Sequence, residues 1–182
     1  MALTASGASN ALTIADLEAM PDDGRRYELI GGSIVMTPAP TPVHQRVSLR
    51  LARMLEEACP PGHEVFVSPI DYDLGDEQRV EPDIIVVPHA SVGEKRLAGP
   101  ARLIVEVVSP GSTANDRFLK RGAYAEAGVP AYWVVDPGRG HILALRMVDG
   151  RYEPYADTDG PVTLDWPVAV SFSVAELAQP PA

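Results

Sequence analysis

Two carboxylates interrupt or border apolar, strand-like segments, where an unpaired charge is costly. Glu106 lies inside the run LIVEVV at residues 103–108, and Asp83 begins the run DIIVV at residues 83–87. A buried carboxylate must be paired, protonated or bound to a metal ion. If the two runs are neighbouring central strands, their acids form a site of hard oxygen ligands suited to Mg²⁺. We therefore expect Asp83 and Glu106 to lie close together at one end of a sheet.

Each candidate residue also has an ordinary structural interpretation when it is taken alone. Glu106 could be a strand-end glutamate paired with an arginine, and Asp83 a turn residue at a strand edge. Lys120 lies on a predicted helix whose same face carries small alanines, so its amine could approach the two acids. Spacing alone, however, favours a solvated surface lysine there. Glu28, in the short strand YELI, is by itself typical of a half-exposed strand acid.

The elements that must position these side chains are short, because 15 glycines and 18 prolines punctuate the chain. Gly31-Gly32 indicates a hairpin turn, and apolar residues at helical spacing after Pro42 indicate a long helix. The pattern predicts helices at 14–20, 40–62 and 113–127, and strands at 26–30, 33–38, 63–74, 83–87, 103–108, 132–135, 141–148, 151–155 and 165–172. These elements predict an α/β fold with a central mixed sheet flanked by at least two helices.

Length and composition fit one globular domain. The chain has 182 residues, of which 46% are hydrophobic and 22% charged, so we expect a single domain at 13–182 after a flexible arm at 1–12. The single cysteine, Cys59, excludes an internal disulfide framework. No apolar run is long enough to span a membrane, and the first residues do not resemble a secretory signal, so a cytoplasmic protein is expected.

The net charge of -10 argues against non-specific binding to nucleic acid. Three arginines, Arg46, Arg50 and Arg53, nevertheless form one basic stripe on the long predicted helix. Most such stripes are merely solvated, but this one could contact phosphates. The glycine-rich nucleotide-binding motifs GxGxxG and GxxxxGK[ST] and the nucleophile elbow GxSxG are absent, which argues against the enzyme classes that use them.

Six segments, in their order along the chain, resemble those of a known bacterial family. They are RRYELIGG at 25–32, PAPTPVHQR at 38–46, VSPIDYDL at 67–74, EPDIIVV at 81–87, LIVEVVSPGSTANDR at 103–117 and K-x3-YAEAGVPAYWVVDP at 120–137. Together they are similar to the Uma-type family, described as putative restriction endonucleases, of the PD-(D/E)xK nuclease superfamily. The resemblance extends from about residue 12 to the end of the chain.

This resemblance implies a restriction-endonuclease-like α/β core and a Mg²⁺-dependent endonuclease, with Mn²⁺ able to substitute. Asp83 and Glu106 match the two superfamily acids and would hold the metal together with the backbone carbonyl of Val107. Metal ions clamp a phosphate oxygen and lower the pKa of bound water, so no covalent intermediate is needed. The expected substrate is DNA, the expected products carry 5′-phosphates, and a homodimer would supply two sites for duplex cleavage.

The family's remaining site residues match less directly. Superfamily members usually carry lysine two residues after the second acid, but this position is Val108 here, and Lys120 on the following helix matches the displaced lysine. Lys120 would orient or deprotonate the attacking water, or offset charge on the phosphate. Glu28 matches the family's N-terminal glutamate, which the resemblance assigns to the site as an aid to metal binding.

Nucleic-acid contacts are expected from the start of the long helix and from the helix that carries Lys120, at His44, Gln45, Arg46, Arg50 and Arg117. Two other functions remain open. The fold could serve as a nucleic-acid-binding module with weak or no cleavage, or as an interaction protein that dimerises through its C-terminal strands, with structural acids. A response to Mg²⁺ or Mn²⁺ would separate a nuclease from both.

Overall fold

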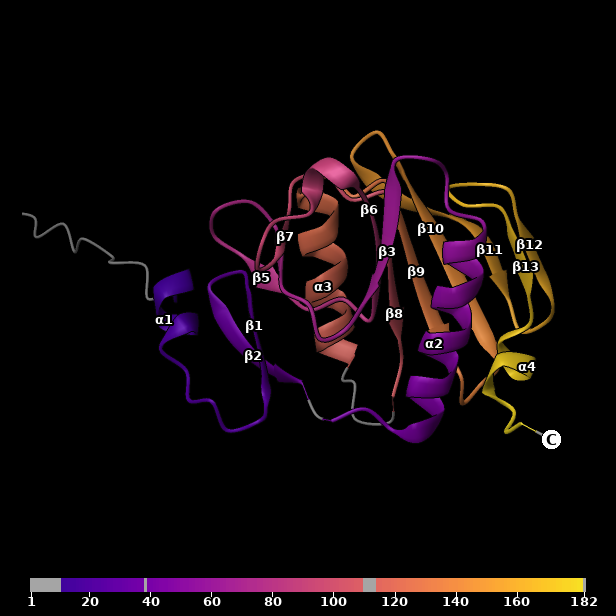
Figure 1. The fold of residues 1–182 in the computed structure, drawn as a ribbon, viewed down its shortest axis with the longest axis horizontal. Coiled ribbons are helices and arrows are strands. Elements are labelled where there is room, and N and C mark those ends of the chain that lie inside the picture. The colour runs from indigo at the N-terminus through magenta and orange to yellow at the C-terminus, as the bar shows by residue number, and fades with distance from the viewer. Residues whose placement is uncertain (1–10, 38, 110–113, 182) are drawn as a thin grey trace, which may run out of the picture.

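Two sheets with a helix between them form the frame of the protein (Figure 1). The computed structural model describes residues 11–37, 39–109 and 114–181, with the backbone alone for 114–117. The larger sheet has the strand order β11 (Arg151–Thr158), β10 (His141–Val148), β9 (Ala131–Asp136), β8 (Leu103–Val107), β6 (Ile84–Pro88) and β3 (His63–Val67). β8 and β9 run parallel, and the other neighbouring strands run antiparallel, so the sheet is mixed.

The smaller sheet is built from short strands of the N-terminal half. Its order is β2 (Ser33–Thr37), β1 (Arg26–Ile30), β5 (Arg79–Val80), β4 (Tyr72–Asp73) and β7 (Leu97–Ala98). Gly31 and Gly32 join β1 to β2 with φ angles of 56° and 72°, a left-handed conformation that favours glycine in a two-residue turn. The remaining elements are α1 (Ile14–Glu18), the 3-10 helix η1 (His89–Ser91), the hairpin β12 (Val162–Leu164) and β13 (Val170–Phe172), and α4 (Val174–Ala178).

Two long helices cover opposite faces of the larger sheet. α2 (Pro42–Glu57) begins where the Thr41 hydroxyl accepts a hydrogen bond from the backbone N–H of His44, and its apolar face packs on the side of β8 that carries Val105. α3 (Ala114–Glu126) ends before Gly128 and packs Tyr124 on the opposite side. The same apolar cluster includes residues of the smaller sheet, so α3 lies between the two sheets.

The predicted α/β class with a mixed sheet flanked by helices is confirmed, but two predicted strands are wrong in extent. The segment 63–74 divides into β3 and β4, which lie in different sheets and are separated by Pro69, a residue without an N–H to donate to a ladder. The segment 165–172 forms only β13. Residues 1–10 of the expected arm lie outside the described part of the chain. Among the described helices, none has the length and apolar character needed to cross a membrane.

Candidate active site

Strand register brings Asp83 and Glu106 to the same face of the larger sheet. β6 and β8 are antiparallel with Ile84 opposite Val105, so one further step places Asp83 opposite Glu106. Residues that face each other across an antiparallel pair point to the same side, and alternation along β8 puts Glu106 on the side of Ile104, which faces α3. The two acids are therefore on adjacent strands at one end of the sheet, as the apolar runs predicted.

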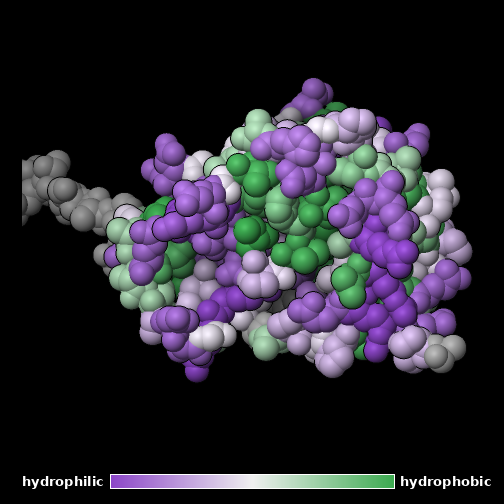
Figure 2. All heavy atoms as spheres, viewed as in Figure 1, coloured by the Kyte–Doolittle hydropathy of each residue, from purple (hydrophilic) through white to green (hydrophobic). Residues whose placement is uncertain are grey.

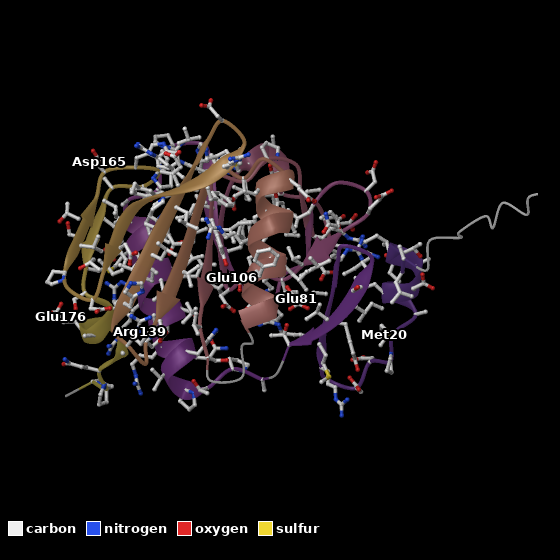
Figure 3. All side chains as sticks on the ribbon, turned by 180° about the vertical axis from the view of Figure 1, so that it is seen from behind. Met20, Glu81, Glu106, Arg139, Asp165 and Glu176 are labelled. Atoms are coloured by element: carbon white, nitrogen blue, oxygen red, sulfur yellow. The ribbon has the colours of Figure 1, made fainter. Side chains whose placement is uncertain are left out.

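Lys120 of α3 joins two of the predicted acids. Its Nζ lies 3.2 and 3.3 Å from the two carboxylate oxygens of Glu106 and 3.0 Å from Oε1 of Glu28 on β1. The interpretation of Lys120 as a solvated surface lysine is wrong, because only 4% of its side chain is exposed. α3 is covered by the smaller sheet on this face, so the amine points into the protein and not into solvent. Figure 3 shows the labelled Glu106 and Glu81 on either side of the α3 ribbon.

The Glu28 side chain is fully buried, and both of its carboxylate oxygens have polar partners. Oε1 accepts a hydrogen bond of 2.7 Å from the backbone N–H of Glu81 in addition to the contact with Lys120, and Oε2 accepts one of 2.8 Å from the Thr37 hydroxyl. The interpretation of Glu28 as a half-exposed strand acid is therefore wrong. Both of its oxygens already have partners, so this carboxylate fixes the position of the Lys120 amine.

Asp83 is held by two donors on one oxygen, while the other oxygen is freer. Oδ2 accepts a hydrogen bond of 2.8 Å from the backbone N–H of Val107 and lies 3.0 Å from Nε2 of His44. Oδ1 has a cation at longer range, the Arg26 guanidinium, at 3.8 Å. Arg26 also pairs with the Glu81 carboxylate at 3.3 Å. Oδ1 is consequently the oxygen of Asp83 that is better able to accept a new ligand.

Several residues of this cluster were missed in the sequence. The Tyr124 hydroxyl donates a 2.6 Å hydrogen bond to Glu106 Oε1. Tyr124 follows Lys120 by four residues and so shares its helix face, a spacing that could have identified it. Arg26 and Thr37 face each other across the β1–β2 hairpin, so the predicted hairpin register could have paired them. Glu81 follows the two-residue strand β5, which carries no periodic signal.

The excess of carboxylates changes how the acids of the cluster ionise. Burial raises the pKa of Glu106 to about 8; the Lys120 charge opposes this rise, and the charges of Asp83 and Glu28 add to it. Burial also acts to raise the pKa of Asp83, but the hydrogen bond and charge of His44, with the Val107 N–H, hold it below its usual value. Without a bound cation, the site therefore keeps Asp83 ionised and stores a proton on Glu106 near neutral pH.

The pKa of Lys120 shifts in the direction opposite to the one that burial alone would cause. Burial acts to lower the pKa of Lys120, but the carboxylates of Glu106 and Glu28 raise it above its ordinary value. The amine is accordingly a permanent positive charge, and it can stabilise an anion or donate a hydrogen bond.

Three of the side chains expected to contact nucleic acid instead contact other parts of the protein. Arg46 donates to the carbonyl of Ala178 at 2.8 Å, and Arg50 donates to the carbonyls of Leu177 and Gln179 at 2.9 and 2.7 Å. These guanidinium groups satisfy the end of α4, so their expected role as phosphate ligands is not supported. His44 is buried against Asp83, Gln45 is exposed, and the side chain of Arg117 lies outside the described part of the structure.

A divalent cation fits this donor set as a partly hydrated ion. Among the residues that the structure describes, no group of three or more His, Cys, Asp or Glu side chains could hold a metal ion. Two carboxylates, Asp83 and Glu106, face the same end of the sheet. Mg²⁺ commonly binds through one or two carboxylates and keeps several waters or takes substrate phosphate oxygens. A cation would also offset the repulsion that raises the pKa of Glu106.

Comparisons with known proteins agree with this fold. The family model Uma2, described as "Putative restriction endonuclease", matches residues 14–176. The crystal structure of a putative nuclease belonging to DUF820 from Anabaena variabilis ATCC 29413 superposes with a TM-score of 0.71. That protein is 16% identical in sequence, and the match covers 92% of this chain and 97% of the other; at such identity the likeness concerns the fold alone. No curated protein matches the sequence.

Proposed function

Because the chain belongs to the Uma2 family of putative restriction endonucleases, we propose that it is a nuclease that hydrolyses phosphodiester bonds with the help of Mg²⁺ or Mn²⁺. The observation that carries this proposal is the buried amine of Lys120, held between Glu28 and Glu106 beside Asp83. A structural ion pair needs one acid. A lysine bracketed by two acids, with a third on the neighbouring strand, is a poor device for stability but a suitable one for anionic chemistry.

The proposed roles follow from which oxygens are already engaged. Asp83, through Oδ1, and Glu106 would hold the cation, with the carbonyl of Val107 as a neutral ligand. A bound cation would lower the pKa of its water and neutralise charge on the scissile phosphate. Lys120 would stabilise the developing negative charge and orient the attacking water. Glu28, whose oxygens are occupied, acts as a positioning residue for Lys120, and not as the metal ligand that the resemblance suggested.

DNA is the substrate we propose first, and a homodimer is the assembly that would cut both strands. A nuclease assay on plasmid DNA, single-stranded DNA and RNA, each with Mg²⁺, Mn²⁺ or EDTA, tests the reaction and the substrate together. Cleavage that requires the metal and leaves 5′-phosphate ends is expected. Cleavage that persists in EDTA would overturn the metal dependence.

A matched pair of variants tests the role of the lysine. Lys120→Met should lower the cleavage rate by about 10²–10³, the usual cost of removing one electrostatic donor. Lys95→Met is the control, because the side chain of Lys95 is exposed whereas that of Lys120 is buried. Circular dichroism must show that both variants are folded. Equal rates for the wild type and Lys120→Met would refute the proposed role.

A non-cleaving nucleic-acid-binding module is the second candidate. It is favoured by the contact of the Lys120 amine with both carboxyl oxygens of Glu106 and by the lack of a three-residue metal group in the described ranges. Retarded migration of nucleic acid without cleavage in either metal would support this function and overturn the first.

A further inference from the structure

A pocket lies between α2 and the end of β3, and Asp83 forms part of its lining. α2 and α3, the helix that carries Lys120, cover opposite faces of the larger sheet. The volume of the pocket is about 580 Å³, and α2 contributes Gln45, Ser48 and Leu49 to its lining, while Val67 and Ser68 form the other wall. Figure 2 shows this face of the molecule, with apolar side chains over β3 beside hydrophilic side chains over α2. Nothing in the roles proposed above uses this space, although Asp83 of the acidic cluster forms part of its lining.

One polar atom in the pocket lining has a property that points to a missing ligand. Ser48 is 5% exposed, and its hydroxyl has no hydrogen-bond partner among the described residues. A buried hydroxyl without a partner destabilises a folded protein, and such groups are rare. Ser48 lines the pocket, so a bound molecule could supply the partner that the protein does not.

The walls of the pocket indicate a flat, weakly polar ligand. Leu49 is 68% exposed and Val67 43% exposed, so two apolar side chains line the opening from opposite elements without being covered. Gln45 adds an exposed amide, which can donate and accept at the same time. The guanidinium groups of Arg46 and Arg50 are engaged by the carbonyls of α4, so the lining offers mainly neutral hydrogen-bonding groups.

We propose that this pocket binds one unpaired nucleobase of the substrate, next to the phosphodiester that the acidic cluster attacks. Apolar side chains can sandwich a base, and amide and hydroxyl groups can read its edge. Asp83 lines the pocket and also belongs to the cluster, so a base in the pocket and a phosphate at the cluster would come from one nucleotide or from adjacent ones. The proposal rests on the proposed nuclease function and narrows its substrate to single-stranded or locally unpaired nucleic acid.

Binding in EDTA tests the pocket without any cleavage. Single-stranded DNA and RNA oligonucleotides that carry 2-aminopurine should become more fluorescent on binding, because the base leaves its stacked neighbours. Ser48→Ala should weaken binding about threefold to tenfold through the loss of one hydrogen bond. Leu49→Ala should weaken it about tenfold through the loss of one stacking wall. Val92→Ala is the matched control, since Val92 is an exposed apolar residue outside the pocket lining.

Stability separates a ligand-binding serine from a structural one. Since the Ser48 hydroxyl has no hydrogen-bond partner in the part of the chain that the structure describes, Ser48→Ala should leave the melting temperature unchanged or raise it while binding weakens. A fall in melting temperature in parallel with binding would show that the serine is structural and would overturn the assignment. This readout does not depend on activity.

Cleavage of a random single-stranded oligonucleotide provides the second arm. Sequencing the product ends should show a base preference at one position beside the cut, and Gln45→Ala and Leu49→Ala should flatten this preference while Val92→Ala keeps it. Cleavage with the same preference in all variants would overturn the pocket and leave the nuclease function intact. Failure of the wild type to bind or cut any nucleic acid would overturn both.

Discussion

The retained proton on Glu106 gives a quantitative test of the acidic cluster in the absence of metal. A carboxyl whose pKa rises from 4.5 to about 8 on folding contributes stability that is fully present below the lower value and is lost as the pH rises through about 8. One pKa unit corresponds to about 1.4 kcal/mol, so the loss is at most about 5 kcal/mol. Because 12% of the Glu106 side chain is exposed, we expect about 2–4 kcal/mol.

Glu106→Gln removes this titration and keeps the shape of the side chain. The amide can still accept the Tyr124 hydrogen bond, and Lys120 retains Glu28 as a partner. In EDTA, the unfolding free energy of the variant relative to the wild type should therefore increase by about 2–4 kcal/mol between pH 5 and pH 8 and level off above that range.

Urea denaturation at several pH values measures this difference. Glu126→Gln, an exposed glutamate on the same helix, is the control and should show a flat difference. A difference that does not change with pH, or that falls as the pH rises, would show that Glu106 is an ordinary ion-pair partner that is ionised throughout.

Three further outcomes test contacts in the structure, and a fourth tests the proposed assembly. Tyr124→Phe should lower the unfolding free energy by about 1 kcal/mol and raise the pKa of Glu106 further, seen as an upward move of the same pH profile. Lys120→Arg should cleave at no more than a few per cent of the wild-type rate, because a planar guanidinium cannot take the place of a compact amine between two acids. Arg50→Ala should lower the unfolding free energy in urea by about 1 kcal/mol, since it leaves the carbonyls of Leu177 and Gln179 at the end of α4 without this donor. Light scattering at micromolar concentration should give the mass of a homodimer, and a monomer would refute the proposed assembly.

The central strands and their acids were predictable because their signal is local. The apolar runs around Asp83 and Glu106 are continuous, as expected for strands covered on both faces, and each contains or borders one carboxylate. Neighbouring strands of this kind leave few arrangements for two such acids. The sequence therefore predicts that both acids lie at the same end of the sheet.

The burial of Lys120 and Glu28 could not be predicted in the same way. Both depend on the smaller sheet, in which β4, β5 and β7 have two residues each and no detectable period. Without that sheet, the face of α3 that carries Lys120 looks solvated. The contact between His44 and Asp83 has the same origin, because the packing of a helix end on a strand end leaves no spacing pattern in the chain.

Lys120 contacts acids of both sheets, and these contacts couple the local unfolding of the N-terminal hairpin to that of α3. The burial of Glu28 depends on its pairing with the Lys120 amine of α3, and the burial of this amine depends in turn on its acids. The N-terminal hairpin and α3 are therefore expected to detach together as one cooperative unit in hydrogen exchange, although they are distant in sequence. A chain still emerging from the ribosome would carry the hairpin long before α3, so no partly made molecule could present an assembled acidic cluster to nucleic acid.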